Sequence, residues 1–227
     1  MFGANFHAGP GQGLSMATCN VVIDLSHNNP NVDLAQAKAG GVQGVIHKAT
    51  QGTGFSDPTY SARRDESKQA GLLWGAYHFA TGADPAAQAR FFLRTAQFTP
   101  GDLLVLDFEL NQASPNNTMT LDQVRVFVST VQDATGITPG LYGGAYLKQQ
   151  LANTSDETLQ ACWLWWAQYG PTPNIPTAWP TWTLWQYTDG HHGNPPFTVD
   201  GIGACDRDQY QGTLEELNAK WITGTLA

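Results

Sequence analysis

Residues 72–109 read LLWGAYHFATGADPAAQARFFLRTAQFTPGDLLVLDFE and contain one complete strand, helix and strand. Leu72 to Phe79 is rich in the apolar and aromatic residues typical of strands, and Leu103 to Glu109 runs four apolar residues into two acids. Between them, Asp84 supplies an N-cap and Pro85 a first helical residue for the alanine-rich segment that follows. Two strands joined by a helix in this way lie parallel in one sheet.

The same order of elements extends to both sides of this unit. Five predicted strands are each followed by a predicted helix: Val21 to Ser26, Val42 to Ala49, Leu72 to Phe79, Leu103 to Glu109 and Gly140 to Gly143. Three further strand-like runs follow with little helix between them: Trp163 to Gln168, Trp182 to Tyr187 and Val199 to Asp206. A last helix, Thr213 to Ile222, is expected to pack outside.

This order predicts an α/β fold, a modified TIM-like barrel of eight strands and about five helices in a β5α5β3 arrangement. The alternative is a doubly wound open sheet, but no GxGxxG follows the first strand and the sequence has no P-loop.

Length and composition predict one large domain. The chain has 227 residues, 41% of them hydrophobic, which suffices for one sizeable core. We expect an N-terminal arm or linker at residues 1–20 and a barrel domain at residues 21–227. Residues 1–20 lack the basic start and apolar middle of a secretory signal.

The charge and the hydropathy pattern exclude two classes of partner. With 11 basic and 19 acidic side chains, the net charge of −8 opposes the phosphate neutralisation on which nucleic-acid binding rests. No apolar run approaches the roughly 20 residues of a membrane span. We therefore expect no nucleic acid, no membrane and a monomeric protein.

Two acids at the end of one predicted strand are the sharpest functional signal. Asp107 and Glu109 lie two residues apart, so their side chains share one face of the strand. Neighbouring carboxylates repel, which raises the proton affinity of one and leaves the other ionised. Glycoside hydrolysis needs such an acid and anion. The alternatives are an exposed acidic strand end or a divalent-metal site.

Other polar and aromatic residues fall at the predicted strand ends, where active sites of barrels lie. Asp24 and Asp206 end the first and last predicted strands, which are neighbours in a closed barrel. For Asp24 the alternative is a capping role, and for Asp206 a surface salt bridge. Predicted substrate-binding residues are Tyr77, Tyr142, Trp185, Gln168 and Lys48, with Trp165 or Trp166 as a further sugar platform, although part of these aromatics belong to the core instead. No cysteine or histidine spacing is typical of a metal site.

At these residues the sequence resembles glycoside hydrolase family 25, the lysozymes that act as N-acetylmuramidases. The resemblance runs from about Val21 to Gly212 and rests on the segments VIDLS at 22–26, KATQG at 48–52, GAYHF at 75–79, LDFE at 106–109, LY at 141–142, LWWAQY at 164–169, LWQY at 184–187 and CDRD at 205–208. It departs from the family at Gln51, where members often have Glu, and at residues 1–20, which precede the family's usual start.

The resemblance implies an eight-stranded barrel with five helices, no cofactor, Glu109 as general acid, and Asp107 stabilising the acetamido group or oxocarbenium centre, with Asp24 and Asp206 in the same acidic set. The expected function is that of a peptidoglycan hydrolase cleaving the β-1,4 bond between N-acetylmuramic acid and N-acetylglucosamine, with residues 21–227 as catalytic domain. A catalytically inactive glycan-binding barrel and a metal-dependent hydrolase are the alternatives. Action is expected at the cell wall, extracellular or periplasmic, by a phage-derived protein or one exported by another route.

Overall fold

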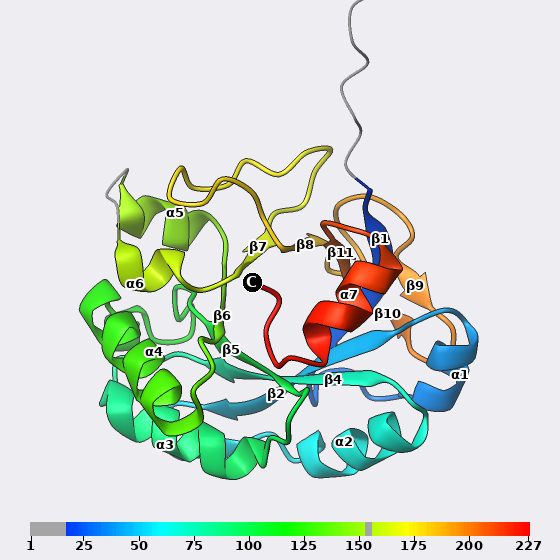
Figure 1. The fold of residues 1–227 in the computed structure, drawn as a ribbon, viewed down its shortest axis with the longest axis horizontal. Coiled ribbons are helices and arrows are strands. Elements are labelled where there is room, and N and C mark those ends of the chain that lie inside the picture. Colours follow the sequence, from blue (N-terminus) through cyan, green and yellow to red (C-terminus); the bar gives the residue numbers. More distant parts are fainter. Residues whose placement is uncertain (1–16, 153–155) are drawn as a thin grey trace, which may run out of the picture.

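The computed structural model describes residues 17–152 and 156–227, which form a closed barrel (Figure 1). The eight barrel strands follow one another around the wall in the order β1 (Cys19–Leu25), β2 (Gly44–Gln51), β4 (Leu73–Phe79), β5 (Leu103–Asp107), β6 (Gly140–Gly143), β7 (Leu164–Ala167), β8 (Leu184–Thr188) and β11 (Asp206–Tyr210). Pairing of β11 with β1 closes the circle, and β11 is antiparallel to both of its neighbours. The other neighbouring strands are parallel.

The first five barrel strands are each followed by a helix, which confirms the predicted β5α5β3 arrangement. These helices are α1 (Leu34–Ala39), α2 (Tyr60–Gln69), α3 (Pro85–Ala96), α4 (Leu121–Thr135) and α5 (Ala145–Leu151). The predicted cap of α3 is also confirmed, because the Asp84 side chain accepts a hydrogen bond from Ala87 N at 2.6 Å. The described chain adds η1 (Pro115–Asn117), α6 (Glu157–Gln160) and α7 (Leu214–Trp221).

Alternating side chains of the strands build two apolar layers. The barrel interior is filled by residues such as Val22, Ile46, Val105 and Trp165. The residues between them on the same strands pack outward against the helices, and the helices contribute Phe92 and Phe127 to this outer layer. Both faces of each strand are therefore buried, and only the barrel ends can hold a solvent-filled site.

The C-terminal helix α7 closes the amino-terminal end of the barrel. The sequence predicts that this helix packs outside the barrel, and that prediction is wrong. Leu217 and Trp221 belong to the interior cluster, and Trp221 Nε1 donates to Trp74 O at 2.9 Å. At Gly44, the first residue of β2, a Cβ atom would lie 2.7 Å from the Trp221 ring, so this approach requires glycine. In Figure 1, α7 lies across the opening of the barrel. The opposite, carboxyl-terminal end remains available for a site.

The prediction of a last strand from Val199 to Asp206 is wrong. Its residues form a small hairpin of β9 (Thr198–Val199) and β10 (Gly203–Ala204) instead, and the barrel strand begins only at Asp206. Gly201 and Gly203 have φ angles of 80° and 89° in this turn, which favour glycine. A further short strand, β3 (Phe55–Ser56), pairs with the end of β2 and was not predicted.

The start of the barrel falls two residues before the predicted boundary, since Cys19 and Asn20 already belong to β1. The remainder of the predicted arm up to residue 16 lies outside the described residues. Within the described ranges, no helix has the length and apolar character needed to cross a membrane.

Candidate active site

A cleft of about 340 Å³ opens at the carboxyl-terminal end of the barrel. It is lined mostly by polar and aromatic side chains: Asp24, Ser26, Asn28, Asn29, Tyr77, Phe79, Asp107, Glu109, Tyr142, Trp165, Tyr169, Gln186 and Asp206. Because barrels of this class carry their active sites at this end, the cleft is the candidate active site.

All four acids predicted as catalytic line this cleft. Asp107 is the last residue of β5, and Glu109 follows it by two residues, so both face inward while Phe108 is buried in the outer layer. Asp24 and Asp206 are direct partners in the pairing of β1 with β11. The cleft therefore has carboxyl groups on two sides, from β5 and from the β1–β11 pair.

Asp206 reaches the cleft by a different route from the predicted one. It begins an antiparallel strand, and the amino end of an antiparallel strand lies at the same barrel edge as the carboxyl ends of its neighbours. The alternative role in a surface salt bridge is not observed, because the Arg207 guanidinium turns to the outer side. It donates to Tyr187 Oη at 3.0 Å and to Thr198 O at 2.7 Å.

A fifth carboxylate, Asp208, lies below Asp206 and was not selected from the sequence. It is fully buried and accepts a hydrogen bond from Trp165 Nε1 at 2.6 Å. Asp206 and Asp208 repeat the two-residue spacing of Asp107 and Glu109, so the alternation along the strand was the signal that could have found it. Asp208 supports the floor of the cleft through Trp165.

Gln186 connects the two sides of the cleft and was likewise not predicted as a site residue. Its Nε2 donates to Asp24 Oδ2 at 2.9 Å. Its Oε1 accepts hydrogen bonds from the hydroxyl groups of Tyr142 at 3.0 Å and Tyr169 at 3.2 Å. The amide thus fixes one carboxylate and two tyrosines in a single network, which preorganises the site.

The predicted tyrosines lie where a ligand could contact them. Tyr77 and Tyr142 both line the cleft and pack edge-on against Trp165, with ring centroids 6.5 Å and 4.7 Å apart. Burial and the neighbouring carboxylates raise the pKa of both tyrosines. Their hydroxyl groups therefore stay protonated at neutral pH.

Three of the predicted substrate-binding residues are not among those that line the cleft: Trp185, Gln168 and Lys48. Trp185 is only 5% exposed and lies in the outer layer, where its Nε1 donates to Gln168 O at 2.7 Å. Gln168 follows β7 and uses its side chain to order the next loop, accepting from Trp166 Nε1 and Asn174 N. Trp185 points outward because side chains alternate along β8 and its neighbour Gln186 points into the barrel.

Lys48 lies at the rim of the cleft. Its Nζ donates to Gln51 Oε1 at 2.8 Å and lies 5.0 Å from the ring centroid of Phe79, which lines the cleft. The positive charge lowers the pKa of Asp107 and of Glu109 against the opposing effects of burial and carboxylate neighbours. Since Gln51 is a neutral partner, the charge of Lys48 remains available to these acids.

The carboxyl groups of the cleft hold protons more tightly than free ones. Burial is the largest cause of the raised pKa of Asp107 and Glu109, and nearby carboxylates add to it. Burial and the charge of Asp189 raise the pKa of Asp206 to about 6. The pKa values of Asp24 and Asp208 are also raised, again chiefly by burial. Such a cluster holds protons to higher pH than isolated carboxyl groups do, as a general acid requires.

This raised pKa predicts how stability depends on pH. A carboxyl that binds protons more tightly in the folded state adds stability below its unfolded pKa of about 4 and loses it as the pH rises through its folded pKa. Asp206→Asn should therefore raise the melting temperature above that of the wild type at about pH 7.5, with no gain at about pH 4.5. The buried His47 and His78, whose pKa values burial lowers to about 4, act oppositely, but the comparison with wild type cancels them. Equal shifts of the melting temperature at both pH values would contradict the raised pKa of Asp206.

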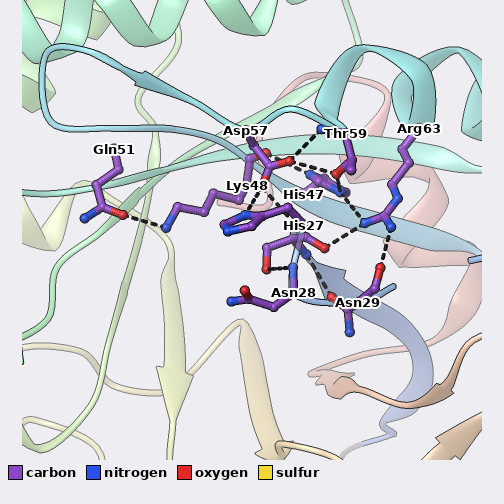
Figure 2. A network of polar contacts seen from close by, with 10 residues as sticks. His27, Asn28, Asn29, His47, Lys48, Gln51, Asp57, Thr59 and Arg63 are labelled. Carbon is purple, nitrogen blue, oxygen red and sulfur yellow. Dashed lines mark hydrogen bonds and ion pairs between the residues drawn. The ribbon is translucent and has the colours of Figure 1, made fainter. Parts of the chain in front are cut away.

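A hydrogen-bonded network fixes the loop after β1 (Figure 2). Ser26, Asn28 and Asn29 of this loop line the cleft. Arg63, buried on α2, donates from Nη1 to Ser26 O at 2.7 Å and from Nη2 to Asn29 O. Asp57 accepts from His27 N at 2.9 Å and from His27 Nδ1 at 2.8 Å. Hydrogen bonds to Arg63 and Asp57 thus fix the position of this loop.

The described residues contain no group of three His, Cys, Asp or Glu side chains that could hold a metal ion. The chemistry that the cleft itself offers is that of paired carboxyl groups, tyrosine hydroxyls and aromatic faces.

Comparison with known proteins agrees with this geometry. Residues 23–194 match the family described as glycosyl hydrolases family 25. The chain is 32% identical over 206 residues to the uncharacterized protein YegX of Escherichia coli K12, covering 87% of this chain and 71% of YegX. It is 28% identical over 226 residues to lysozyme M1 of Streptomyces globisporus, covering 87% of this chain and 69% of that lysozyme.

The fold is also similar to that of a solved enzyme. The structure of a muramidase from Acremonium alcalophilum matches with a TM-score of 0.76 and 29% identity, covering 89% of this chain and 98% of that one. The similarity therefore extends over almost the whole barrel.

Proposed function

Because the chain belongs to family 25 of the glycosyl hydrolases, we propose that it is a lysozyme of the N-acetylmuramidase type. Its substrate is peptidoglycan, and the bond cleaved is the β-1,4 bond from N-acetylmuramic acid to N-acetylglucosamine. The observation that carries the proposal is the cleft itself, in which Asp107 and Glu109 project from β5 toward Asp24 and Asp206. The barrel, which begins at Cys19, acts as one catalytic domain, and a monomer suffices for activity because one chain supplies the residues that line the cleft.

Glu109 acts as the general acid. Burial and the charge of Asp206 raise its pKa, which favours the protonated form that a general acid needs. That proton passes to the glycosidic oxygen as the bond from the muramic acid C1 breaks, so the glucosamine sugar leaves as a neutral alcohol. The resulting Glu109 carboxylate then takes a proton from the water that attacks C1.

Asp107 stabilises the sugar on the other side of the broken bond. Its Oδ1 is buried and has no hydrogen-bond partner among the described residues. A buried acceptor of this kind favours a ligand donor, and the acetamido N–H of the muramic acid supplies one. Holding that group orients its carbonyl oxygen toward C1, where positive charge develops. The anomeric configuration is then retained, as the resemblance to the family implies.

Tyr77, Tyr142 and Trp165 provide the surface on which the sugar lies. The Tyr77 hydroxyl can donate a hydrogen bond to the sugar, whereas the Tyr142 hydroxyl, which gives its proton to Gln186 Oε1, can accept one, and the aromatic faces cover the apolar side of a pyranose ring. The positive charge of Lys48 lowers the pKa of Asp107 and of Glu109. The enzyme acts on the cell wall, and we propose extracellular or periplasmic action by a phage-derived protein or one exported by another route.

Digestion of purified peptidoglycan with identification of the new reducing-end sugar by mass spectrometry tests this function. We expect fragments that end in muramic acid, and the same yield in the presence of EDTA. Fragments ending in glucosamine, or amino acids released without new reducing sugars, would contradict the assigned bond. Loss of activity with EDTA that one divalent ion restores would support the metal-dependent hydrolase, and binding without cleavage would support a glycan-binding barrel.

A further inference from the structure

An exposed aromatic surface continues the cleft beyond the residues that line it. Phe55 of β3 is 40% exposed, although large apolar side chains are normally covered. Its ring centroid lies 5.5 Å from that of His27 and 5.6 Å from Lys48 Nζ. Lys48 also contacts Phe79 in the cleft wall. We call Phe55, His27 and Lys48 the hairpin platform, after the β2–β3 hairpin that carries Phe55.

Hydrogen bonds to Asp57 and Gln51 hold His27 and Lys48 of the hairpin platform in place (Figure 2). Although burial opposes ionisation of Asp57, hydrogen bonds from His27 and Thr59 lower its pKa, so it is a carboxylate. His27 Nδ1, 2.8 Å from Asp57 Oδ2, must then carry the proton of this hydrogen bond, which leaves Nε2 available to a ligand. Lys48 Nζ donates to the neutral Gln51 amide, and no described carboxylate lies within ion-pairing distance of it. Both groups retain hydrogen-bonding capacity.

The barrel topology places a second exposed aromatic residue across the cleft. In the closed ring of eight strands, β2 and β7 are opposite, with β4, β5 and β6 on one side and β8, β11 and β1 on the other. Tyr169, which follows β7 and lines the cleft, is 41% exposed. A polymer that runs from Tyr169 to Phe55 therefore passes between the carboxyl groups of β5 and those of β1 and β11.

We propose that the hairpin platform is a subsite for an N-acetylhexosamine residue of the glycan strand, next to the cleft in which the bond is cleaved. The proposal rests on the proposed function, which supplies the glycan. A pyranose ring has an apolar face that stacks on Phe55, and hydroxyl and acetamido groups that can hydrogen-bond to His27 Nε2 and to the donors of Lys48. The peptide that branches from muramic acid is a different ligand, which the test excludes by using oligomers without peptide.

Binding measurements on a protein that cannot cleave its ligand test this subsite. In a Glu109→Gln background, isothermal titration calorimetry is performed with the disaccharide and the hexasaccharide of β-1,4-linked N-acetylglucosamine. We expect Phe55→Ala to weaken binding of the hexasaccharide about tenfold, as for the loss of one stacking contact. Binding of the disaccharide, which occupies the central cleft, should not change, and Phe55→Trp should restore hexasaccharide binding.

Ile222→Ala is the matched control, because Ile222 is 66% exposed and follows α7 at the opposite end of the barrel. It should leave both affinities and the melting temperature unchanged. Unchanged hexasaccharide binding in Phe55→Ala, or an equal loss for both oligomers, would overturn the subsite. The wild-type digestion of peptidoglycan separates this outcome from failure of the proposed function: if muramic acid ends still appear, only the subsite is wrong, and if they do not, the function fails and the subsite with it.

Discussion

Glu109→Gln is expected to lower the rate of peptidoglycan cleavage by about 10²–10⁴-fold, the loss typical of removing a general acid. Glutamine keeps the size of the side chain but has no proton to give to the leaving oxygen. The pKa of Glu109 is raised chiefly by burial, so the substitution also removes a carboxyl that is costly to ionise. Stability should therefore not fall, and the melting temperature checks that the lost rate is chemical.

The leaving group of the substrate makes this prediction specific. In a substrate that carries an activated phenol in place of the glucosamine, the phenolate leaves without protonation, so the loss in Glu109→Gln should shrink strongly on that substrate. Glu66→Gln on α2 is the matched control, because Glu66 is exposed on the helical side of the barrel. Near wild-type cleavage of peptidoglycan by Glu109→Gln would contradict the assignment of Glu109 as the general acid.

The position of these acids could be predicted from the sequence because local patterns determine it. The run of apolar residues from Leu103 to Leu106 fixes β5, and alternation then places Asp107 and Glu109 on one face. The cap at Asp84 is equally local, since a side chain and an amide three residues later define it. Strand and helix order followed from such signals, and the barrel followed from the order.

Features that depend on distant pairing could not be predicted in this way. All five residues of β8 are buried, so its sequence does not show which face points inward, and Trp185 was assigned to the wrong side. Asp206 was placed at the end of a strand because the β9–β10 hairpin reads as a continuation of it. The position of α7 depends on Trp221 filling the barrel end, a contact that its amphipathic pattern does not specify.

Asp107→Asn is the second substitution expected to cripple the enzyme, by about 10²–10³-fold, the effect of removing one preorganised electrostatic contact in a transition state. Asparagine keeps the shape and one acceptor oxygen, but its amide brings N–H donors to the place where Oδ1 now has no described partner. The acetamido group of the substrate is then no longer held by a negative charge. Glycan binding should persist, because Tyr77, Tyr142 and Trp165 are untouched.

The activated phenol substrate distinguishes Asp107 from Glu109. Asp107 acts on the charge that develops at C1, which any leaving group requires, so Asp107→Asn should remain equally impaired on that substrate while Glu109→Gln recovers. Burial raises the pKa of Asp107 well above its ordinary value, and Lys48 opposes this effect. Lys48→Met should therefore shift the alkaline limb of the rate profile upward in pH, since loss of the cation raises the pKa of both acids. Recovery of Asp107→Asn on the phenol substrate would show that this carboxyl serves the leaving group, and the roles of the two acids would then be reversed.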